Sequence, residues 1–196
     1  MKLDTMSGLK RTDYCGTLTI DKIGETVVVC GWAARQRDLG QLIFIDLRDR
    51  TGIVQLAFDD TTDREIFSKA FQVRSEYVLM AKGTVRKRSS VNPDIPTGEI
   101  EIEVTELKVL GSAETTPFEI LDDTSVKEEL RLKYRYLDLR RPTLQNNLVM
   151  RHKVTKVTRD FFDGEGFLEI ETPTLIKSTP EGARDYLVPS RIHKGS

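Results

Sequence analysis

The chain has 196 residues, of which 38% are hydrophobic and 31% charged, and its formal net charge is −1. This composition is typical of a water-soluble protein with one large domain, or one complete domain and part of another. Because the net charge is close to zero, any nucleic-acid site must be a local basic patch. The chain has no apolar run of about 18 residues, which excludes a membrane span. Its first residues lack the apolar core of a signal peptide, which favours a cytoplasmic location.

The first half of the chain is rich in strand patterns. Residues 1–12 look like a loose N-terminal tail, and residues 13–110 form the first predicted domain. Apolar and β-branched runs predict strands over 27–37, 42–48 and 53–58, joined by short turns into a meander. A glycine inside the first run, Gly31, indicates a bulge or a sharp bend.

One helix interrupts the strands. Thr62, with Glu65 three positions later, is predicted to cap a short amphipathic helix. Two further strands are predicted over 77–85 and 100–109, with a proline-containing loop between them. Three strands, a helix and two strands are the elements of a five-stranded OB barrel, although a small α+β sandwich would give a similar pattern.

The second half changes character. Residues 111–143 are polar or dense in charge and are predicted to be a hinge or linker. A second helix is predicted from Leu144, and a glycine cap near Gly166 is expected to end it. The next ten residues look like a buried strand that ends at Pro173, because proline cannot donate a ladder hydrogen bond. We therefore expect residues 144–196 to be the first part of a second, larger domain.

Cys15 and Cys30 lie in apolar runs without the spacing of metal ligands, so we expect them to be reduced and buried.

Phe44 is the strongest binding candidate in the predicted barrel. Most strand phenylalanines belong to a core, but strict alternation puts Phe44 on the face opposite Ile43 and Ile45. An exposed ring near Arg35 and Arg37 suits an unstacked base and its phosphates, and one base stack contributes about 1–3 kcal/mol. Gln55, on the adjacent predicted strand, could present its amide to a base edge.

A second basic group follows the fourth predicted strand. No acidic residue lies between Lys82 and Arg88, and Arg86 and Arg88 are candidate phosphate contacts. A solvated strand end is the competing interpretation. Asn92 and Glu101 are polar groups that could contact base edges, and Glu181 lies in a loop where a carboxylate could bind an ammonium group.

Several long stretches resemble one known family. The helix followed by Gly-Phe-Leu-Glu-Ile-Glu-Thr-Pro-Thr-Leu (166–175) resembles motif 1 of the class II aminoacyl-tRNA synthetases. The OB-like domain before it is typical of their aspartate, asparagine and lysine subgroup. The stretches around 31–50, 131–142 and 179–191 resemble the bacterial aspartyl-tRNA synthetases, and the likeness runs from about Arg11 to the end.

This resemblance implies the fold and the partners. It implies an all-β OB barrel that binds the tRNA anticodon, a hinge, and the start of an α+β catalytic domain built on an antiparallel sheet. The full enzyme would be an aspartate–tRNA ligase that uses ATP and Mg²⁺, binds aspartate and tRNA(Asp), and forms a homodimer. The motifs that supply the ATP arginines are not among these 196 residues, so we expect this chain to be inactive alone and to hold no cofactor.

The resemblance also implies residue roles. Phe44 would be the anticodon stacking ring, and Arg37, Gln55 and Glu101 would contact anticodon bases. Glu181 would lie near the ammonium group of aspartate, in a loop expected to be mobile. Pro173 would belong to the dimer interface. No residue of this chain is implied to be catalytic or to bind a metal.

Two positions bear on tRNA recognition. The family often has an arginine where this chain has Gln36, which implies slightly less positive charge facing phosphates. Leu39 lies where some relatives with relaxed tRNA choice carry histidine, which implies strict choice of aspartate tRNA. Two alternatives stay open, a free-standing OB nucleic-acid binder and the asparagine- or lysine-specific relative.

Overall fold

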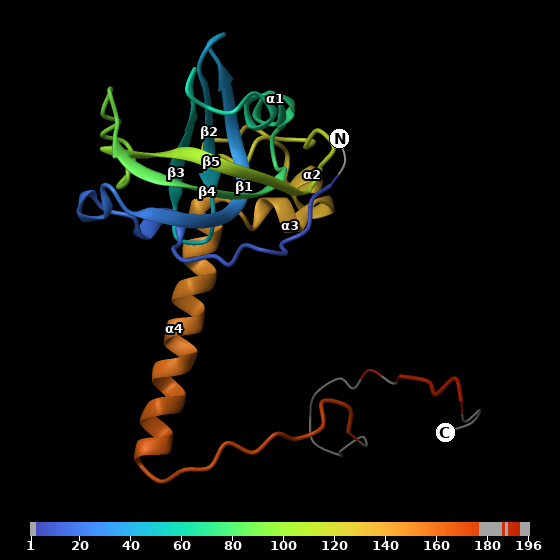
Figure 1. Ribbon diagram of the computed structural model, residues 1–196. Helices are drawn as coiled ribbons and strands as arrows, with labels where there is room; N and C mark the ends of the chain where they lie inside the picture. The colour runs from blue at the N-terminus through green and yellow to red at the C-terminus, as the bar shows by residue number, and fades with distance from the viewer. Residues whose placement is uncertain (1–2, 177–185, 187, 193–196) are drawn as a thin grey trace. The chain divides into compact units, whose positions relative to one another are not determined.

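The computed structural model describes residues 3–176, 186 and 188–192 (Figure 1). The chain divides into two compact units, Met1–Glu119 and Ile120–Ser196. The division falls inside the stretch 111–143 that the sequence predicts to be a hinge or linker. The first unit holds the five strands and one α-helix, and the second holds the remaining helices.

The first unit is a closed five-stranded barrel with the strand order β1-β2-β3-β5-β4. All neighbouring strands are antiparallel except β3 and β5, which pair in parallel and close the barrel. This arrangement confirms the OB-type barrel, and each of the five strands predicted for the barrel is present within a few residues. The strands are β1 (Thr26–Asp38), β2 (Ile43–Arg48), β3 (Ile53–Phe58), β4 (Val78–Lys87) and β5 (Ile100–Gly111).

The β1 strand pairs with two neighbouring strands in succession. Its first half pairs with β4 and its second half with β2, and the register shifts between Ala33 and Arg35. The bulge therefore lies after Gly31 rather than at it. Gly31 instead allows a close approach, because a Cβ there would lie 2.3 Å from the carbonyl oxygen of Arg48.

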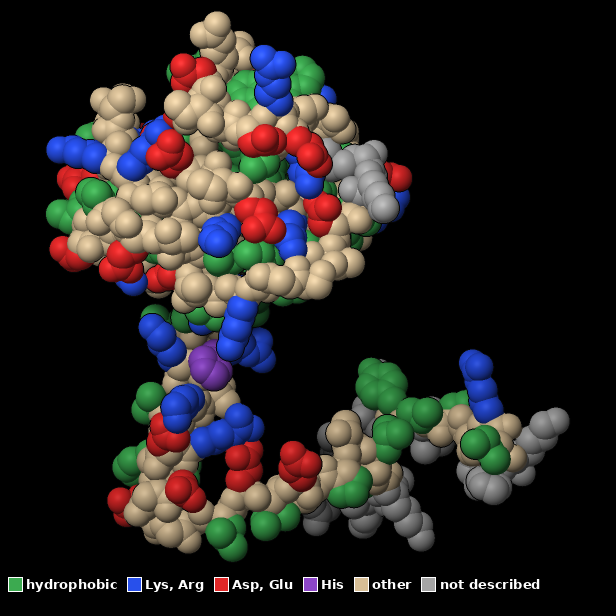
Figure 2. Space-filling view, in the orientation of Figure 1, with side chains coloured by type: hydrophobic (Ala, Val, Ile, Leu, Met, Phe, Trp, Pro, Cys, Tyr) green, Lys and Arg blue, Asp and Glu red, His purple; other side chains and the backbone are tan. Residues whose placement is uncertain are grey.

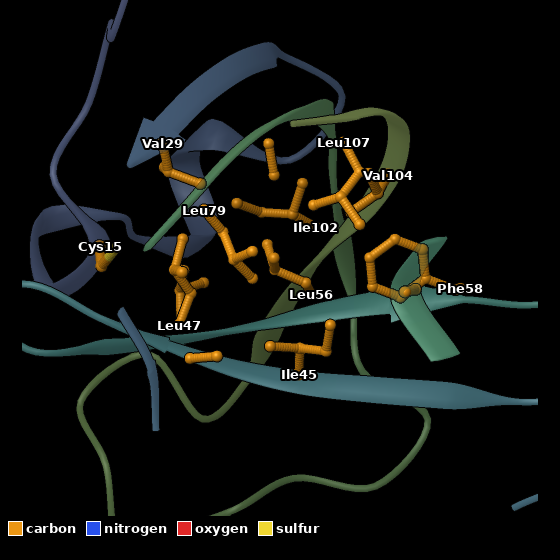
Figure 3. Packing of buried hydrophobic residues seen from close by; sticks show 14 of the residues in the cluster. Cys15, Val29, Ile45, Leu47, Leu56, Phe58, Leu79, Ile102, Val104 and Leu107 are labelled. Atoms are coloured by element: carbon orange, nitrogen blue, oxygen red, sulfur yellow. The ribbon is translucent and has the colours of Figure 1, made fainter. Parts of the chain in front are cut away.

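The barrel core consists of the inward-facing residues of every strand (Figure 3). Ile45, Leu47, Leu56, Leu79 and Ile102 are fully buried and converge on the barrel axis. Burial of such aliphatic side chains, at roughly 25 cal/mol per Å² of apolar surface, is the main stabilising term of the barrel. Cys15 joins this core from a 3₁₀ turn, η1 (Cys15–Thr17), and burial raises the pKa of its thiol.

The helix α1 (Arg64–Gln72) begins one residue later than the predicted cap implies. The N-cap is Asp63, whose carboxylate accepts hydrogen bonds from the backbone N–H groups of Glu65 and Ile66. Thr62 is outside the helix because its hydroxyl accepts from the N–H of Asp59. An ionised carboxylate satisfies the first-turn donors and also favours the positive end of the helix dipole.

The described part of the N-terminal segment, residues 3–12, is docked on the barrel, so the prediction of a loose tail is wrong for these residues. Asp4 exchanges two hydrogen bonds with Val109 of β5, one through its backbone N–H and one through its carboxylate. The same carboxylate pairs with Lys69 of α1 at 3.2 Å. Further along, Thr12 bonds to Val28 of β1. The partners lie far away in the sequence, so the pattern of the tail itself contains no sign of them. A second 3₁₀ turn, η2 (Ile20–Lys22), then leads into β1.

The second unit begins with helical turns where a plain linker was predicted. These are α2 (Glu128–Lys133) and α3 (Arg135–Asp138), and they surround the buried carboxylate of Asp138. Arg135 and Arg141 donate to this carboxylate at 2.7 and 3.0 Å. One buried anion thus organises a segment whose like charges would otherwise repel one another.

The long helix α4 (Pro142–Gly164) starts two residues before the predicted start at Leu144, with Pro142 at its first position. Proline is suited to the first helical position because its missing N–H has no partner there and its φ angle is already helical. Both carboxylate oxygens of Asp122 accept from the N–H of Thr143 in the same first turn. At the other end, Gly166 adopts a φ of +83° and confirms the predicted glycine cap.

The buried strand predicted over residues 166–175 is not formed. These residues are exposed and form no ladder with a described strand, and Leu168 and Ile170 are 82% and 72% exposed. A strand needs a neighbouring segment for its backbone N–H and C=O groups, and no described segment supplies one.

Candidate nucleic-acid interface

The half-buried ring of Phe44 marks the candidate site on the outer face of the barrel. In β2, Ile43, Ile45 and Leu47 are fully buried, whereas the residues between them are partly exposed. Phe44 is therefore not a core residue, as the alternation predicts. In the β1–β2 ladder it lies opposite Arg37, whose guanidinium carbon is 5.7 Å from the centre of the ring. This contact holds a cation beside the ring.

Gln55 connects Arg37 to Glu101 across the sheet. Its side-chain oxygen accepts from Arg37 Nη2 at 2.8 Å, and its Nε2 donates to Glu101 Oε2 at 2.7 Å. The strand register explains the proximity, because Gln55 pairs with Asp46 on one side and with Glu101 on the other. Gln55 and Glu101 are only 3% and 5% exposed. The structure thus brings together the three predicted base-contact residues in one polar chain.

Arg86 occupies the far end of this chain. Its Nε donates to Glu101 Oε1 at 2.8 Å and its Nη2 to Asp59 at 3.0 Å, and Nη1 lies 3.4 Å from Glu103. Burial opposes the charge, but the hydrogen bonds with Glu101 and Asp59 prevail and raise the pKa of Arg86. Three carboxylates neutralise this guanidinium, so the structure does not support Arg86 as a phosphate contact.

The other two candidate phosphate contacts differ from Arg86. Arg35 is exposed on β1, and Arg88 lies just beyond the end of β4. Neither forms an ion pair with any residue that the structure describes. The Nε of Arg88 is buried without a hydrogen-bond partner in the described part of the chain. These two arginines therefore retain their charge for an external anion.

Neighbouring positions have clear structural roles. Gln36 donates to the carbonyl oxygens of Ala70 and Phe71, both at 3.1 Å, so it caps the end of α1 rather than facing a phosphate. Leu39, at the tip of the β1–β2 hairpin, is 67% exposed. Three carboxylates that were not predicted as site residues also contact the arginines of the site: Asp46, Asp59 and Glu103. Only Asp46 carried a local signal, because it shares the outward face of β2 with Phe44.

A hollow of about 670 Å³ adjoins this face near α1. Its lining contains three aspartates and a single arginine, in addition to aromatic and small residues. A phosphate chain would be repelled there, whereas Arg35 and Arg88 would attract it. Its chief lining residues are Asp38, Asp59, Asp60, Thr62, Arg64 and Phe71.

Charges of both signs are mixed over the barrel face shown in Figure 2, so the basic groups act locally rather than as a broad field. Within the described ranges, no helix combines the length and the apolar character that crossing a membrane requires.

The second unit leaves a large apolar surface exposed. On α4 and the segment after it, several large side chains are more than half exposed, and Pro173 lies in the same exposed segment. A bidentate, solvent-exposed ion pair joins Arg159 of α4 to Glu169 in the segment after it. Glu181 lies outside the described residues. The exposed apolar residues include Met150, Val154, Val157, Phe161, Leu168 and Ile170.

Two family models match the two parts of the chain. Residues 27–110 match the OB-fold nucleic acid binding domain of the tRNA anticodon type. Residues 127–196 match the class II tRNA synthetases of the aspartate, lysine and asparagine group.

Curated bacterial relatives match almost the entire chain. The aspartate–tRNA(Asp/Asn) ligase of Halothermothrix orenii is 57% identical over 194 residues, which is 98% of this chain and 33% of that protein. The chain is a homologue of the bacterial aspartate–tRNA ligases. Another ligase homologue, the aspartate–tRNA ligase of Ruminiclostridium cellulolyticum, is 59% identical over 98% of this chain and 32% of its own length. The chain thus spans about a third of the length of the curated ligases it matches.

Solved structures agree with this homology. The asparaginyl-tRNA synthetase of Pyrococcus horikoshii, complexed with asparaginyl-adenylate, has a TM-score of 0.75 at 26% identity over 89% of this chain and 39% of that one. The aspartyl-tRNA synthetase of Entamoeba histolytica has a TM-score of 0.79 at 22% identity over 90% of this chain and 43% of that one. The second comparison shows the shared fold alone.

Proposed function

We propose that the outer barrel face binds the anticodon loop of a tRNA, and that the whole protein is an aspartate–tRNA ligase. The observation that carries the first part is the position of Phe44 next to the polar chain of Arg37, Gln55 and Glu101. A ring that is free to stack, beside a fixed amide and carboxylate, matches what a protein needs to hold and read an unstacked base.

Arg35 and Arg88 would bind the phosphates of the same loop. Both lie on this unit without an ion-pair partner among the described residues, so their charge is not neutralised by a carboxylate of the barrel. Phosphate contacts supply affinity and register, whereas the polar chain would supply selectivity for the base.

The activity of the whole protein is proposed from homology. It would activate aspartate with ATP and then transfer the aspartate to the 3′ end of tRNA(Asp). Mg²⁺ would neutralise phosphate charge in such a reaction. In the described ranges, no group of three or more His, Cys, Asp or Glu side chains could hold a metal ion. The aspartate-binding role of Glu181 stays a proposal, as does a location in the cytoplasm.

A second copy of the chain is the proposed partner of the exposed α4 surface. Burying side chains such as Val154, Val157 and Phe161 would contribute roughly 25 cal/mol per Å² of apolar surface. Pro173 would lie in this interface. Analytical ultracentrifugation tests the proposal, because Val157→Asp should shift a dimer to a monomer, whereas Lys153→Asp on the same helix should shift it much less.

Binding of labelled RNA stem-loops to the chain tests the anticodon site. We expect a stem-loop with the aspartate anticodon to bind more tightly than otherwise identical stem-loops with single anticodon changes. Equal affinities for all of them would contradict anticodon recognition and favour a general single-strand binder. The stem-loop with the asparagine anticodon is the most informative competitor. Leu39 implies strict choice of aspartate tRNA, whereas some of the matching relatives are named for both tRNA(Asp) and tRNA(Asn).

A further inference from the structure

We infer that Arg86, anchored by Asp59, is a positioning residue that fixes the base-reading group made of Gln55 and Glu101. The inference rests on the proposed anticodon site. It goes further because it distinguishes the residue that orients the base-reading group from the residues that contact RNA. It also replaces a phosphate-binding role for Arg86 with an indirect one.

The side-chain amide of Gln55 lies between a donor and an acceptor. Its oxygen faces a donor, Arg37 Nη2, and its nitrogen faces an acceptor, Glu101 Oε2. If the amide rotated by half a turn, its NH₂ group would face the guanidinium of Arg37 and its oxygen would face the carboxylate. Both contacts would then be repulsive and almost fully buried. The network therefore allows Gln55 one orientation, with one remaining donor and one remaining acceptor position for a base.

This selection works only if Glu101 keeps its carboxylate in place. Oε2 is used by Gln55, and Oε1 is held by Arg86 at 2.8 Å. Arg86 is in turn held from the other side, by Asp59 at 3.0 Å and by Glu103 at 3.4 Å. The fork of the guanidinium can bond to several carboxylates in fixed directions, which the point-like ammonium of lysine cannot reproduce.

Asp59 is itself firmly placed. It follows β3 directly, and its other carboxylate oxygen accepts from the hydroxyl and the backbone N–H of Thr61. The hydrogen bond from Thr61 and the contact with Arg86 hold the pKa of Asp59 below its usual value. The turn after β3 thus fixes the position of Asp59, and Asp59 in turn fixes the direction in which Arg86 of β4 donates its hydrogen bonds.

Arg86→Lys is the deciding variant, and Arg48→Lys is its matched control. Arg48 forms a comparable ion pair with the buried Glu76, with contacts of 2.8 and 3.0 Å, but it lies outside the polar chain. For Arg86→Lys we expect the affinity ratio between the aspartate stem-loop and single-base variants to fall roughly tenfold, the scale of one lost base-reading contact. The salt dependence of binding should stay unchanged, because Arg86 contacts no phosphate. Arg48→Lys should change neither quantity.

Nitrogen-15 relaxation of the Gln55 side-chain amide supplies a readout without RNA. We expect this amide to be rigid in the wild type and in Arg48→Lys, and mobile in Arg86→Lys. Asp59→Asn leaves Arg86 in place. Compared with Arg86→Lys, it should make the Gln55 amide less mobile and should reduce the affinity ratio less. This variant decides the matter if Arg86→Lys fails to fold.

These measurements distinguish a failure of the proposed function from a failure of the inference about Arg86. If the wild type binds all stem-loops equally while the amide is rigid and depends on Arg86, the proposed function is wrong and only the structural part of the inference survives. If the wild type discriminates but Arg86→Lys retains its discrimination and a rigid amide, the inference alone is wrong. A lower salt dependence in Arg86→Lys would show a direct phosphate contact and would also overturn it.

Discussion

Gln55 and Glu101 pair across the parallel β3–β5 ladder, and the amide nitrogen of Gln55 donates to the carboxylate of Glu101 at 2.7 Å. The two residues are 46 positions apart in the chain. Closure of the barrel is what makes them neighbours, so the same ladder that completes the fold also builds the candidate reading group.

Phe44→Ala should weaken binding of the aspartate anticodon stem-loop by about 1–3 kcal/mol, because one base stack is lost. The stability of the barrel should change little, since the ring lies outside the core. Phe58→Ala is the matched control, because Phe58 is fully buried and its truncation should cost about 3–5 kcal/mol of stability. Fluorescence anisotropy and thermal denaturation measure the two effects. A large loss of stability in Phe44→Ala would argue against a stacking role.

Arg88→Ala should reduce the salt dependence of RNA binding, lowering the slope of log K against log salt by about 0.7, the value for one contact to a single strand. Arg35→Ala should behave in the same way. Arg64→Ala is the control, because Arg64 lines the acidic hollow near α1. Titrations at several salt concentrations measure the slopes, and an unchanged slope in both Arg88→Ala and Arg35→Ala would exclude them as phosphate contacts.

Gly31→Ala should destabilise the barrel strongly. The added Cβ would lie 2.3 Å from the carbonyl oxygen of Arg48, which belongs to the backbone of the neighbouring strand and cannot move without shifting β2. We expect a loss of several kcal/mol, comparable to severe overpacking of a core. Gly164→Ala is the control, because a Cβ there meets no atom within 4 Å. Urea denaturation compares the two, and equal stabilities would mean that β1 and β2 can separate locally.

Asp4 should give the barrel a stabilising contribution that depends on pH. The hydrogen bond from the Val109 N–H, followed by the contacts with Lys69, keeps the pKa of Asp4 below 3.8 in the folded state. A carboxyl group whose folded pKa is depressed stabilises the protein fully above its unfolded pKa, and this contribution disappears as the pH falls through the folded pKa. Asp4→Ala should therefore be less stable than wild type at neutral pH, and the difference should vanish in acid.

Thermal denaturation of wild type and Asp4→Ala between about pH 7 and pH 2 measures this difference in stability. Groups that titrate alike in the two proteins contribute equally to both and cancel in the difference. Asp21→Ala is a suitable control, because the carboxylate of Asp21 contacts only the nearby Thr19 hydroxyl among the described side chains. A stability difference for Asp4→Ala that stays constant with pH would show that the docking of the N-terminal segment does not depend on the charge of Asp4.

The sequence by itself determined the strands, their faces and the family. Alternation in β2 depends only on the two-residue period of a strand, so it placed Phe44 outside the core before any partner strand was known. The glycine cap at Gly166 is likewise a local backbone requirement. Long family stretches were recognisable because they are continuous in the chain.

The tertiary structure alone decided the roles that depend on distant partners. Arg86 looked like a free cation beside Lys87 and Arg88, but its neighbours in space are the carboxylates of Asp59, Glu101 and Glu103. The N-terminal segment looked loose, yet Asp4 finds its partner 105 positions away. Backbone and carboxylate hydrogen bonds act over about 3 Å regardless of separation along the chain, so only the closed barrel reveals them.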